Sequence, residues 1–394
     1  MKPLEGVTVL DLSRVLAASL GTMILAEFGA TEIKVEQPGD GDELRINEPF
    51  YKGESAYFFA ANRSKRSITA NLKHPEGRDL VKALATKADL LVENFTVGTM
   101  ARLGLDYPVM KEINPRLVYV SASGFGQTGP YAARKGYDTV FQAMTGLMSL
   151  TGERDGPPVK AGLPFADLTS GLWVAIACML GLSGRNASGH GAHMDYSMMD
   201  GQVSLLSVAA ARFFALGEIP QRMGTEHLGR VPSGTFKCGD GKWLQITCSD
   251  KQWPRLCTVL GIEEWGRSPV AATGAARLKN REQVMAHLRE KLQAWKRNEV
   301  VARCAEADVP AGPVNELDEV FADPQVVARE VVREFMHPVV GSFPGLAMPI
   351  KMTGLDGPTF GAPPVLGQHT DEILTGWLGY TPERVQAMRD KGAI

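Results

Sequence analysis

In the first third of the chain, short apolar runs rich in β-branched residues alternate with longer helical patterns. We predict helices at Val15–Phe28 and about 76–88, and strands at Gly6–Leu12, Glu32–Glu36, Ala88–Glu93 and Leu117–Ser121. Strands that alternate with helices of this length favour βαβ units, so we predict an α/β fold with a parallel sheet. Parallel sheets bind ligands in the loops at the carboxyl ends of their strands. The loops to consider therefore begin near Ser13, Gln37, Asn94 and Ala122.

The remainder of the chain predicts a change of architecture. Leu168–Leu182 and Met199–Leu216 are expected to form two long buried helices. From about residue 225, a hairpin around Gly239–Gly241 followed by helical patterns up to about 307 predicts a small α+β domain. The segment from about 330 is rich in Gly and Pro and is expected to end in a helix from about Pro382.

Charge and cysteine content exclude several classes of function. Lys and Arg number 42 against 44 Asp and Glu, a net charge of −2, so we expect no nucleic-acid partner. The five cysteines form no CxxC pair, and His190 and His193 lack a third ligand. We therefore expect neither disulfides nor a metal site, and a reducing, cytoplasmic location.

The uncharged run Leu168–Gly184 is the one candidate for a membrane span. Its length is at the lower limit of about 17 residues for such a helix. It contains the polar residues Thr169 and Ser170, and the chain offers no second candidate. We predict a helix buried in a large core, and no membrane association.

Gly124–Gly129 matches GxGxxG and follows a predicted strand. A dinucleotide fingerprint must also open a helix toward the pyrophosphate. Here Pro130 follows at once, and Gly136 interrupts any helix. We predict a Gly-rich loop beside a site, and neither NAD nor FAD as a cofactor.

Asp167 is the last charge before the uncharged run, and the residues alone leave two roles open for it. Asp is a preferred helix N-cap, but a carboxylate at a helix N-terminus can also act as a nucleophile. Burial would raise its pKa by more than the helix N-terminus lowers it, so a nucleophile here must be only partly buried or have further donors. Asn94 with Arg102 suits a nucleotide or phosphate, although residue type alone favours a turn Asn and a solvated Arg. His227 fits a surface position as well as a catalytic one.

Together these segments resemble the class III coenzyme A transferases, the family of formyl-CoA transferase and carnitine CoA-transferase. The resemblance runs essentially from end to end and is carried by Pro3–Val7, Leu10–Ala17, Gly29–Ala30, Ile33–Glu36, Asn62–Ile68, Val92–Phe95, Gly124–Pro130 and Leu366–Thr370. It implies a large Rossmann-like domain, 1–224 completed by 321–394, with a small α+β domain at 225–320 inserted between them. It also implies an interlocked homodimer in which each subunit is threaded through the other.

The resemblance implies roles for individual residues as well. Asp167 falls at the family's catalytic aspartate, whose carboxylate attacks an acyl-CoA thioester without any cofactor beyond the coenzyme A of the substrate. A mixed anhydride and an aspartyl-CoA thioester follow, and the acceptor acid then takes over the CoA. The positions that line the family's CoA channel are Val15, Leu16, Ala17, Leu72, Lys73, Asn94, Phe95, Arg102, Lys135 and Met198.

Within the family, the stretch 224–237 is similar to the branch that uses dicarboxylates such as succinate, glutarate, itaconate and citramalate. Leu16 stands where formyl-CoA transferase has a Gln, which disfavours formate and oxalate and leaves an apolar wall suited to a methylene chain. The predicted reaction moves CoA from succinyl-CoA to a C4–C6 dicarboxylate. A buried distal carboxylate needs a cation, and the candidate substrate contacts are Tyr137, His227, Arg230 and Arg45.

The alternative is α-methylacyl-CoA racemase, which shares the fold and the aspartate. Its pattern has His in a Gly-His-Asp triplet, whereas this chain has Gly136, Tyr137 and Asp138 in succession. A neutral phenol with a pKa of about 10 is a poor base at neutral pH. Transfer is therefore favoured over racemisation.

Overall fold

The structure is a computed structural model that describes all 394 residues, and the chain forms two compact units. The first unit comprises 1–147, 160–211 and 325–394, and the second comprises 148–159 and 212–324.

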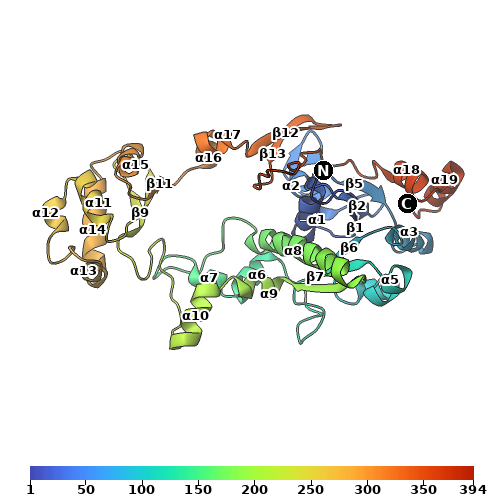
Figure 1. The fold of residues 1–394 in the computed structure, drawn as a ribbon, viewed down its shortest axis with the longest axis horizontal. Coiled ribbons are helices and arrows are strands. Elements are labelled where there is room, and N and C mark those ends of the chain that lie inside the picture. The colour runs from blue at the N-terminus through green and yellow to red at the C-terminus, as the bar shows by residue number, and fades with distance from the viewer. The chain divides into compact units, whose positions relative to one another are not determined.

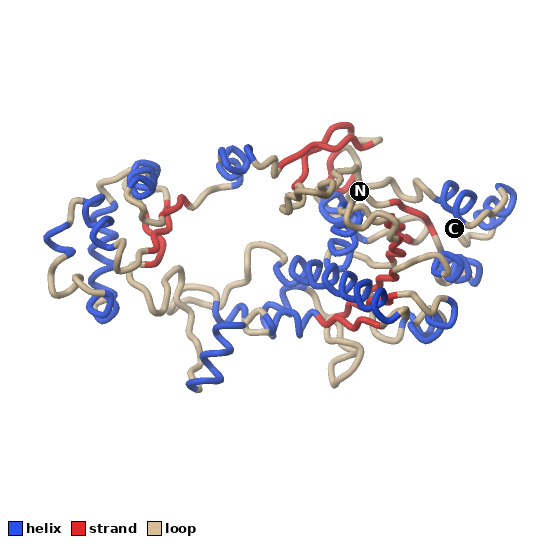
Figure 2. The backbone as a smooth tube through the Cα atoms, in the orientation of Figure 1, coloured by secondary structure: helices blue, strands red, loops and turns tan.

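The first unit contains a sheet of six parallel strands in the order β5-β2-β1-β6-β7-β8, with helices on both of its faces (Figures 1 and 2). The strands of this sheet are β1 (Thr8–Asp11), β2 (Thr31–Glu36), β5 (Arg66–Thr69), β6 (Leu90–Glu93), β7 (Val118–Ser123) and β8 (His193–Ser197). Two small hairpins accompany it, β3 (Phe50–Tyr51) with β4 (Glu54–Ser55) and β12 (Val332–His337) with β13 (Gly341–Leu346). The helices are α1 (Ala17–Glu27), η1 (Glu43–Ile46), α2 (Ala56–Asn62), α3 (Pro75–Ala85), α4 (Thr99–Leu103), α5 (Tyr107–Ile113), α6 (Asp138–Met144), α8 (Phe165–Ser188), α9 (Met198–Ser204), α18 (Thr370–Glu372), η2 (Ile373–Trp377) and α19 (Pro382–Asp390).

The strand order reverses at β1. The chain runs outward from β1 to β2 and β5 on one side, and then returns to place β6, β7 and β8 on the other. The helices that follow β1 and β6, α1 and α5, consequently cover opposite faces of the sheet, and such a point in a parallel sheet is where a crevice for ligands forms. The predicted α/β class with a parallel sheet is confirmed.

A separate apolar core fills each face of the sheet. On one face, α1 and α8 pack on Val9, Val92 and Val120. On the other, α3 and α5 pack on Leu10, Leu91 and Tyr119, and the C-terminal segment up to Ile394 joins this core. Residues that alternate along one strand therefore serve opposite cores, which is why β1, β6 and β7 contain the continuous apolar and aromatic runs Val9–Leu10, Leu90–Val92 and Val118–Val120.

Two glycines allow α1 and α8 to touch closely. A Cβ added to Gly21 would lie 2.8 Å from the carbonyl oxygen of Gly171, and one added to Gly171 would lie 2.9 Å from Leu20. Larger residues at either position would force the helices apart. The contact fixes the first turn of α8, which carries Asp167, against the helix that follows β1.

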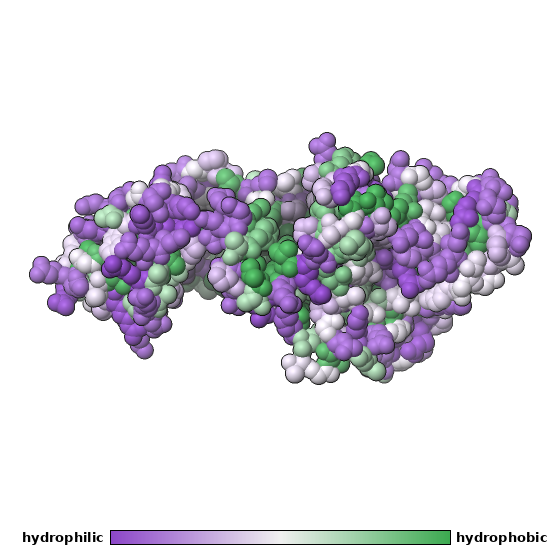
Figure 3. Space-filling view, turned by 90° about the horizontal axis from the view of Figure 1, so that it is seen from above, coloured by the Kyte–Doolittle hydropathy of each residue, from purple (hydrophilic) through white to green (hydrophobic).

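The predicted burial of the uncharged run Leu168–Gly184 is confirmed for one face of α8 and wrong for the other. The face with Val174, Ala175 and Cys178 is buried, whereas Leu172 is 54% and Leu180 61% exposed. α8 has the length and apolar character of a membrane span, with 44% of its most apolar stretch buried within the protein. Figure 3 views the molecule from above the orientation of Figure 1. On that face, hydrophobic residues also reach the surface between hydrophilic ones.

The single helix predicted over Met199–Leu216 is wrong. The chain forms α9 and then α10 (Ser207–Leu216), with Ser207 at φ 33° between them. α10 has no buried residue, so it does not belong to a core within this chain. Short helices α7 (Leu147–Leu150) and α17 (Pro324–Ala328) lie, like α10, where the two units join in sequence.

The second unit is a small α+β unit. The predicted hairpin is confirmed, because β9 (Ser233–Lys237) pairs antiparallel with β10 (Trp243–Thr247), and β11 (Ala311–Pro313) adds a third strand. The remaining elements are α11 (Trp253–Leu260), α12 (Glu263–Gly266), α13 (Gly274–Lys279), α14 (Arg281–Leu292), α15 (Arg297–Glu306) and α16 (Leu317–Ala322). Apolar side chains of β9, β10, α11, α14 and α15 form most of the unit's own core.

Candidate active site

A cavity of about 360 Å³ opens in the first unit where the strand order reverses. Its walls come from the loops after β1 and β6, the end of β7, the loop before α6 and the first turn of α8. It brings together the sequence-predicted residues Asp167, Val15, Leu16, Ala17, Asn94, Phe95, Lys135, Tyr137 and Met198.

Asp167 lies in the first turn of α8 but is not its N-cap. Pro164 occupies the cap position and offers no side-chain hydrogen bond. The cap is supplied by Asp138, whose Oδ1 accepts hydrogen bonds from the backbone N–H groups of Ala166 (2.7 Å) and Asp167 (3.2 Å). Because another carboxylate caps the helix, the side chain of Asp167 is left free to face the cavity.

Burial raises the pKa of Asp167 to about 6, and the negative charge of Asp138 adds to the effect. The group is nevertheless only partly buried. At neutral pH most of these carboxyl groups are therefore ionised, in a site that solvates the charge less well than water does. A carboxylate in that condition is more basic, and a better nucleophile, than an exposed Asp.

Two tyrosines that the sequence did not single out lie within electrostatic range of Asp167. Burial raises the pKa of Tyr196 to about 12 and that of Tyr57 above its usual value, with Asp167 contributing to both. The Tyr196 hydroxyl donates to Ser170 Oγ at 2.9 Å, and Ser170 donates to the carbonyl of Ala166. Both phenols stay neutral, so they supply polar surface near Asp167 without another charge.

Basic residues surround the rest of the cavity. Arg14, Arg134 and Lys135 all line it. The guanidinium of Arg14 lies 4.7 Å from the centre of the Phe95 ring, and that of Arg134 lies 4.4 Å from the Tyr131 ring. Only Lys135 was predicted from the sequence. Three carboxyl groups, those of Asp167, Asp138 and Glu43, also line the cavity, so an anionic ligand would be held by individual placed cations and not by a net positive charge.

The other predicted CoA contacts do not line this cavity. Leu72 packs against the core of the α3 face, and Lys73 is exposed beside it. Arg102 is also exposed and donates to Thr99 Oγ1 at 2.8 Å. Whether these residues meet an outer part of a CoA molecule stays a prediction.

The predicted cations for the distal carboxylate fall in two places. Arg45 lies in the first unit, where it pairs with Glu36 at 2.6 Å and covers the Phe58 ring at 3.7 Å. His227 and Arg230 are exposed in the second unit, at the two ends of a tight turn. Their meeting with a substrate stays a prediction.

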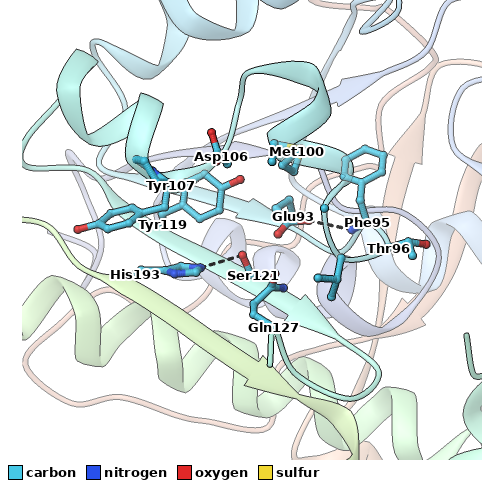
Figure 4. A pocket seen from close by; sticks show the side chains of 14 residues that line it. Glu93, Phe95, Thr96, Met100, Asp106, Tyr107, Tyr119, Ser121, Gln127 and His193 are labelled. Carbon is cyan, nitrogen blue, oxygen red and sulfur yellow. Dashed lines mark hydrogen bonds between the residues drawn. The ribbon is translucent and has the colours of Figure 1, made fainter. Parts of the chain in front are cut away.

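A second cavity, of about 400 Å³, lies under α4 and α5 and shares the wall Phe95–Val97 with the first. In Figure 4 the side chains of Glu93, Ser121 and His193 point toward one another, and Ser121 Oγ lies 3.0 Å from His193 Nε2. Burial raises the pKa of Glu93. No Lys or Arg lines this cavity, so the cavity with Asp167 is the better match for a phosphorylated ligand.

The Gly124–Gly129 loop does not have the geometry of a dinucleotide site. β7 ends at Ser123, but the next helix, α6, begins only at Asp138. No helix N-terminus therefore follows the glycines directly, as a pyrophosphate site of this kind requires. Gly124 itself lines the cavity with Asp167, as expected for a loop beside a site.

Residues 4–370 match the family described as CoA-transferase family III, and the chain belongs to it. The protein is therefore a class III CoA-transferase.

Named relatives cover almost the whole chain. It is 37% identical to succinyl-CoA:glutarate CoA-transferase of Homo sapiens, over 100% of this chain and 90% of that protein. It is 38% identical to succinate–glutarate CoA-transferase of Agrobacterium fabrum, over 94% of this chain and 95% of that protein. The crystal structure of a CAIB/BAIF family protein from Brucella suis superimposes with a TM-score of 0.87 at 41% identity, over 95% of this chain and 99% of that one.

Proposed function

We propose that this enzyme transfers CoA from succinyl-CoA to a C4–C6 dicarboxylate such as glutarate, with Asp167 as the nucleophile. The observation that carries the proposal is the free, partly buried Asp167 carboxylate with a pKa of about 6, in a cavity with three cations. The two relatives named for succinate and glutarate support the choice of substrates.

The proposed reaction needs no group beyond Asp167 and the two substrates. An Asp167 oxygen attacks the thioester carbonyl, the C–S bond breaks, and a mixed anhydride and CoA thiolate form. The thiolate attacks the Asp167 carbonyl, which releases the donor acid and leaves an aspartyl-CoA thioester. The acceptor carboxylate then attacks that thioester, and the returning thiolate takes the acceptor acyl group and frees Asp167.

The basic residues of the cavity have a proposed role in holding CoA. Lys135 and Arg134 carry charge that can pair with the phosphates, and Val15–Ala17, Phe95 and Met198 offer apolar surface to the pantetheine arm. Leu16 is 3% exposed, so it gives the acyl group an apolar wall without a polar contact. His227 and Arg230 remain the proposed partners of the distal carboxylate.

Arg45 is a weaker candidate for the same role. Its guanidinium donates twice to Glu36, at 2.6 and 2.8 Å, and once to the carbonyl of Pro364. A substrate carboxylate would have to displace Glu36, which is itself buried. The cost of unpairing a buried charge opposes that exchange.

We further propose an interlocked homodimer of Rossmann-like large domains, 1–224 with 321–394, in the cytoplasm. The strand order matches that of doubly wound nucleotide-binding sheets. The exposed apolar faces of α8 and α10 would be covered by the partner subunit. Five free, buried cysteines fit a reducing compartment.

The direct test is a transfer assay with succinyl-CoA as donor and a panel of mono- and dicarboxylates as acceptors. New acyl-CoA is detected by chromatography and mass spectrometry. We expect glutarate and its near neighbours in length to be the best acceptors. If no dicarboxylate on the panel is converted while another acid is, the substrate assignment fails and the family assignment stands.

Exchange at the α-carbon distinguishes transfer from racemisation. With a 2-methylacyl-CoA in D₂O, we expect no Asp167-dependent uptake of deuterium, because Tyr137, which is 82% exposed, stands where the racemase pattern has its His base. Mass spectrometry of the recovered thioester measures the uptake. Rapid uptake that disappears in Asp167→Ala would favour the racemase alternative.

The pH dependence of transfer should report the ionisation of Asp167. Since the nucleophile must be ionised, kcat should fall as the pH drops through about 6. Asp138→Asn removes the neighbouring negative charge but keeps an oxygen to accept from Ala166 and Asp167, so the fall should move to lower pH. The measurement is kcat against pH for both proteins, with Asp200→Asn as a control. An unchanged profile in Asp138→Asn would mean that Asp138 does not influence the nucleophile.

A further inference from the structure

The turn that follows β1 has a backbone conformation that its sequence disfavours. Val15 has a φ of 59°, in the left-handed region where a β-branched side chain collides with its own backbone. Its side chain is 36% exposed and, with Leu16 and Ala17, forms a wall of the Asp167 cavity. Such a conformation persists only where surrounding groups impose it.

Asp42 is one of the groups that impose it. Its Oδ1 accepts hydrogen bonds from the backbone N–H of Val15 at 3.1 Å and of Leu44 at 2.9 Å. Lys34 Nζ lies 2.8 Å from Asp42 Oδ2, and both side chains are shielded from solvent. The same ammonium donates to the carbonyl of Ser13 at 2.9 Å. Lys34 therefore ties Asp42 to the residue just before the turn.

Asn94 holds the turn from the opposite side. Its Oδ1 accepts from the N–H of Arg14 and its Nδ2 donates to the carbonyl of Arg14, both at 2.8 Å. Asn94 lines the cavity itself, whereas Asp42 and Lys34 do not. Asp42 can therefore act on a ligand only indirectly, through the turn at Val15 or through Glu43, which follows it in the chain and lines the cavity.

We infer that Asp42 is a positioning residue for acyl-CoA binding, because it holds Val15 in the left-handed conformation that gives this wall of the cavity its shape. The inference rests on the proposal that the cavity takes the acyl-CoA. Without Asp42 the turn can relax to an ordinary conformation, and CoA would bind only the fraction of molecules in which the wall is formed. The apparent dissociation constant rises in proportion as that fraction falls.

The test measures the dissociation constant of free CoA by calorimetry on the full chain, which does not depend on the acceptor acid. Asp42→Ala is expected to raise this dissociation constant by about tenfold. A change of that size corresponds to a free energy within the range that a left-handed non-glycine residue costs. Glycine adopts a positive φ freely. In a Val15→Gly background, the same Asp42→Ala change is therefore expected to raise it by about threefold at most.

Glu27→Gln is the matched control. Glu27 is another buried carboxylate of this unit, paired with Arg63 at 2.8 Å, and it does not line the cavity. It should lower the thermal unfolding midpoint as Asp42→Ala does, but leave CoA binding unchanged. If Asp42→Ala does not fold, Asp42→Asn replaces it. Its increase in the dissociation constant of CoA should be smaller, and should again be larger with Val15 than in the Val15→Gly background.

Each outcome separates the possibilities. An effect of Asp42 substitution that is equal in the Val15 and Val15→Gly backgrounds overturns the positioning role, as does an unchanged dissociation constant. If the native protein binds no CoA at all, the proposed function fails before the inference is reached.

Discussion

Asp167→Ala should abolish transfer, lowering kcat by up to about 10⁶-fold while CoA still binds. The proposed chemistry has no second route, since both covalent intermediates form on this carboxylate. The side chain is free because Asp138 caps the helix in its place. Removing it should therefore leave α8 and the cavity wall intact. Single-turnover rates and the dissociation constant of CoA measure the two halves of this expectation.

The matched control is Asp200→Ala, which removes an exposed aspartate from the first turn of α9 in the same unit. Its rate should remain within a few-fold of the native enzyme. Hydroxylamine trapping or mass spectrometry of native enzyme mixed with succinyl-CoA should place an adduct on Asp167. Near-normal turnover in Asp167→Ala, or an adduct on a different residue, would refute the mechanism.

The central strands were predictable because burial on both faces leaves a clear sequence signal. β1, β2, β6 and β7 coincide with the predicted strands to within a few residues, although β2 alternates Ile33 and Val35 with buried charged residues. β5 and β8 were not predicted, since they are the outer strands of the sheet and carry residues such as Arg66, His193 and Asp195. Edge strands need no continuous apolar run, so periodicity alone does not mark them.

Part of the site was predictable and part depends on tertiary contacts. Asp167 and the loops after β1 and β6 follow from strand ends and from the family resemblance. The cap supplied by Asp138 comes from 28 and 29 residues before the groups it binds, so no local pattern reveals it. The pairing of Arg45 with Glu36 likewise depends on how η1 packs beside β2. Arg14 was not predicted as a site residue, although it lies in the loop after β1 that the strand pattern had indicated.

The second large effect should be discrimination between glutarate and valerate as acceptors. The two acids have the same chain length, and valerate lacks only the distal carboxylate. If a cation in the site pairs with that group, valerate leaves the cation unpaired and desolvated. Discrimination against an analogue that lacks a required polar partner is large, here about 10²-fold or more in kcat/KM. Equal rates with both acids would end the dicarboxylate assignment.

The cation itself can be identified by removing the candidates one at a time. His227→Ala or Arg230→Ala should reduce the preference for glutarate mainly by slowing glutarate, since valerate never used the cation. Arg45→Ala differs, because it unpairs the buried Glu36 and should lower thermal stability along with both rates. A preference for glutarate that survives in all three variants would keep the substrate class and reject these residues. Arg14 and Arg134, which line the cavity beside Asp167, would then be the next to replace.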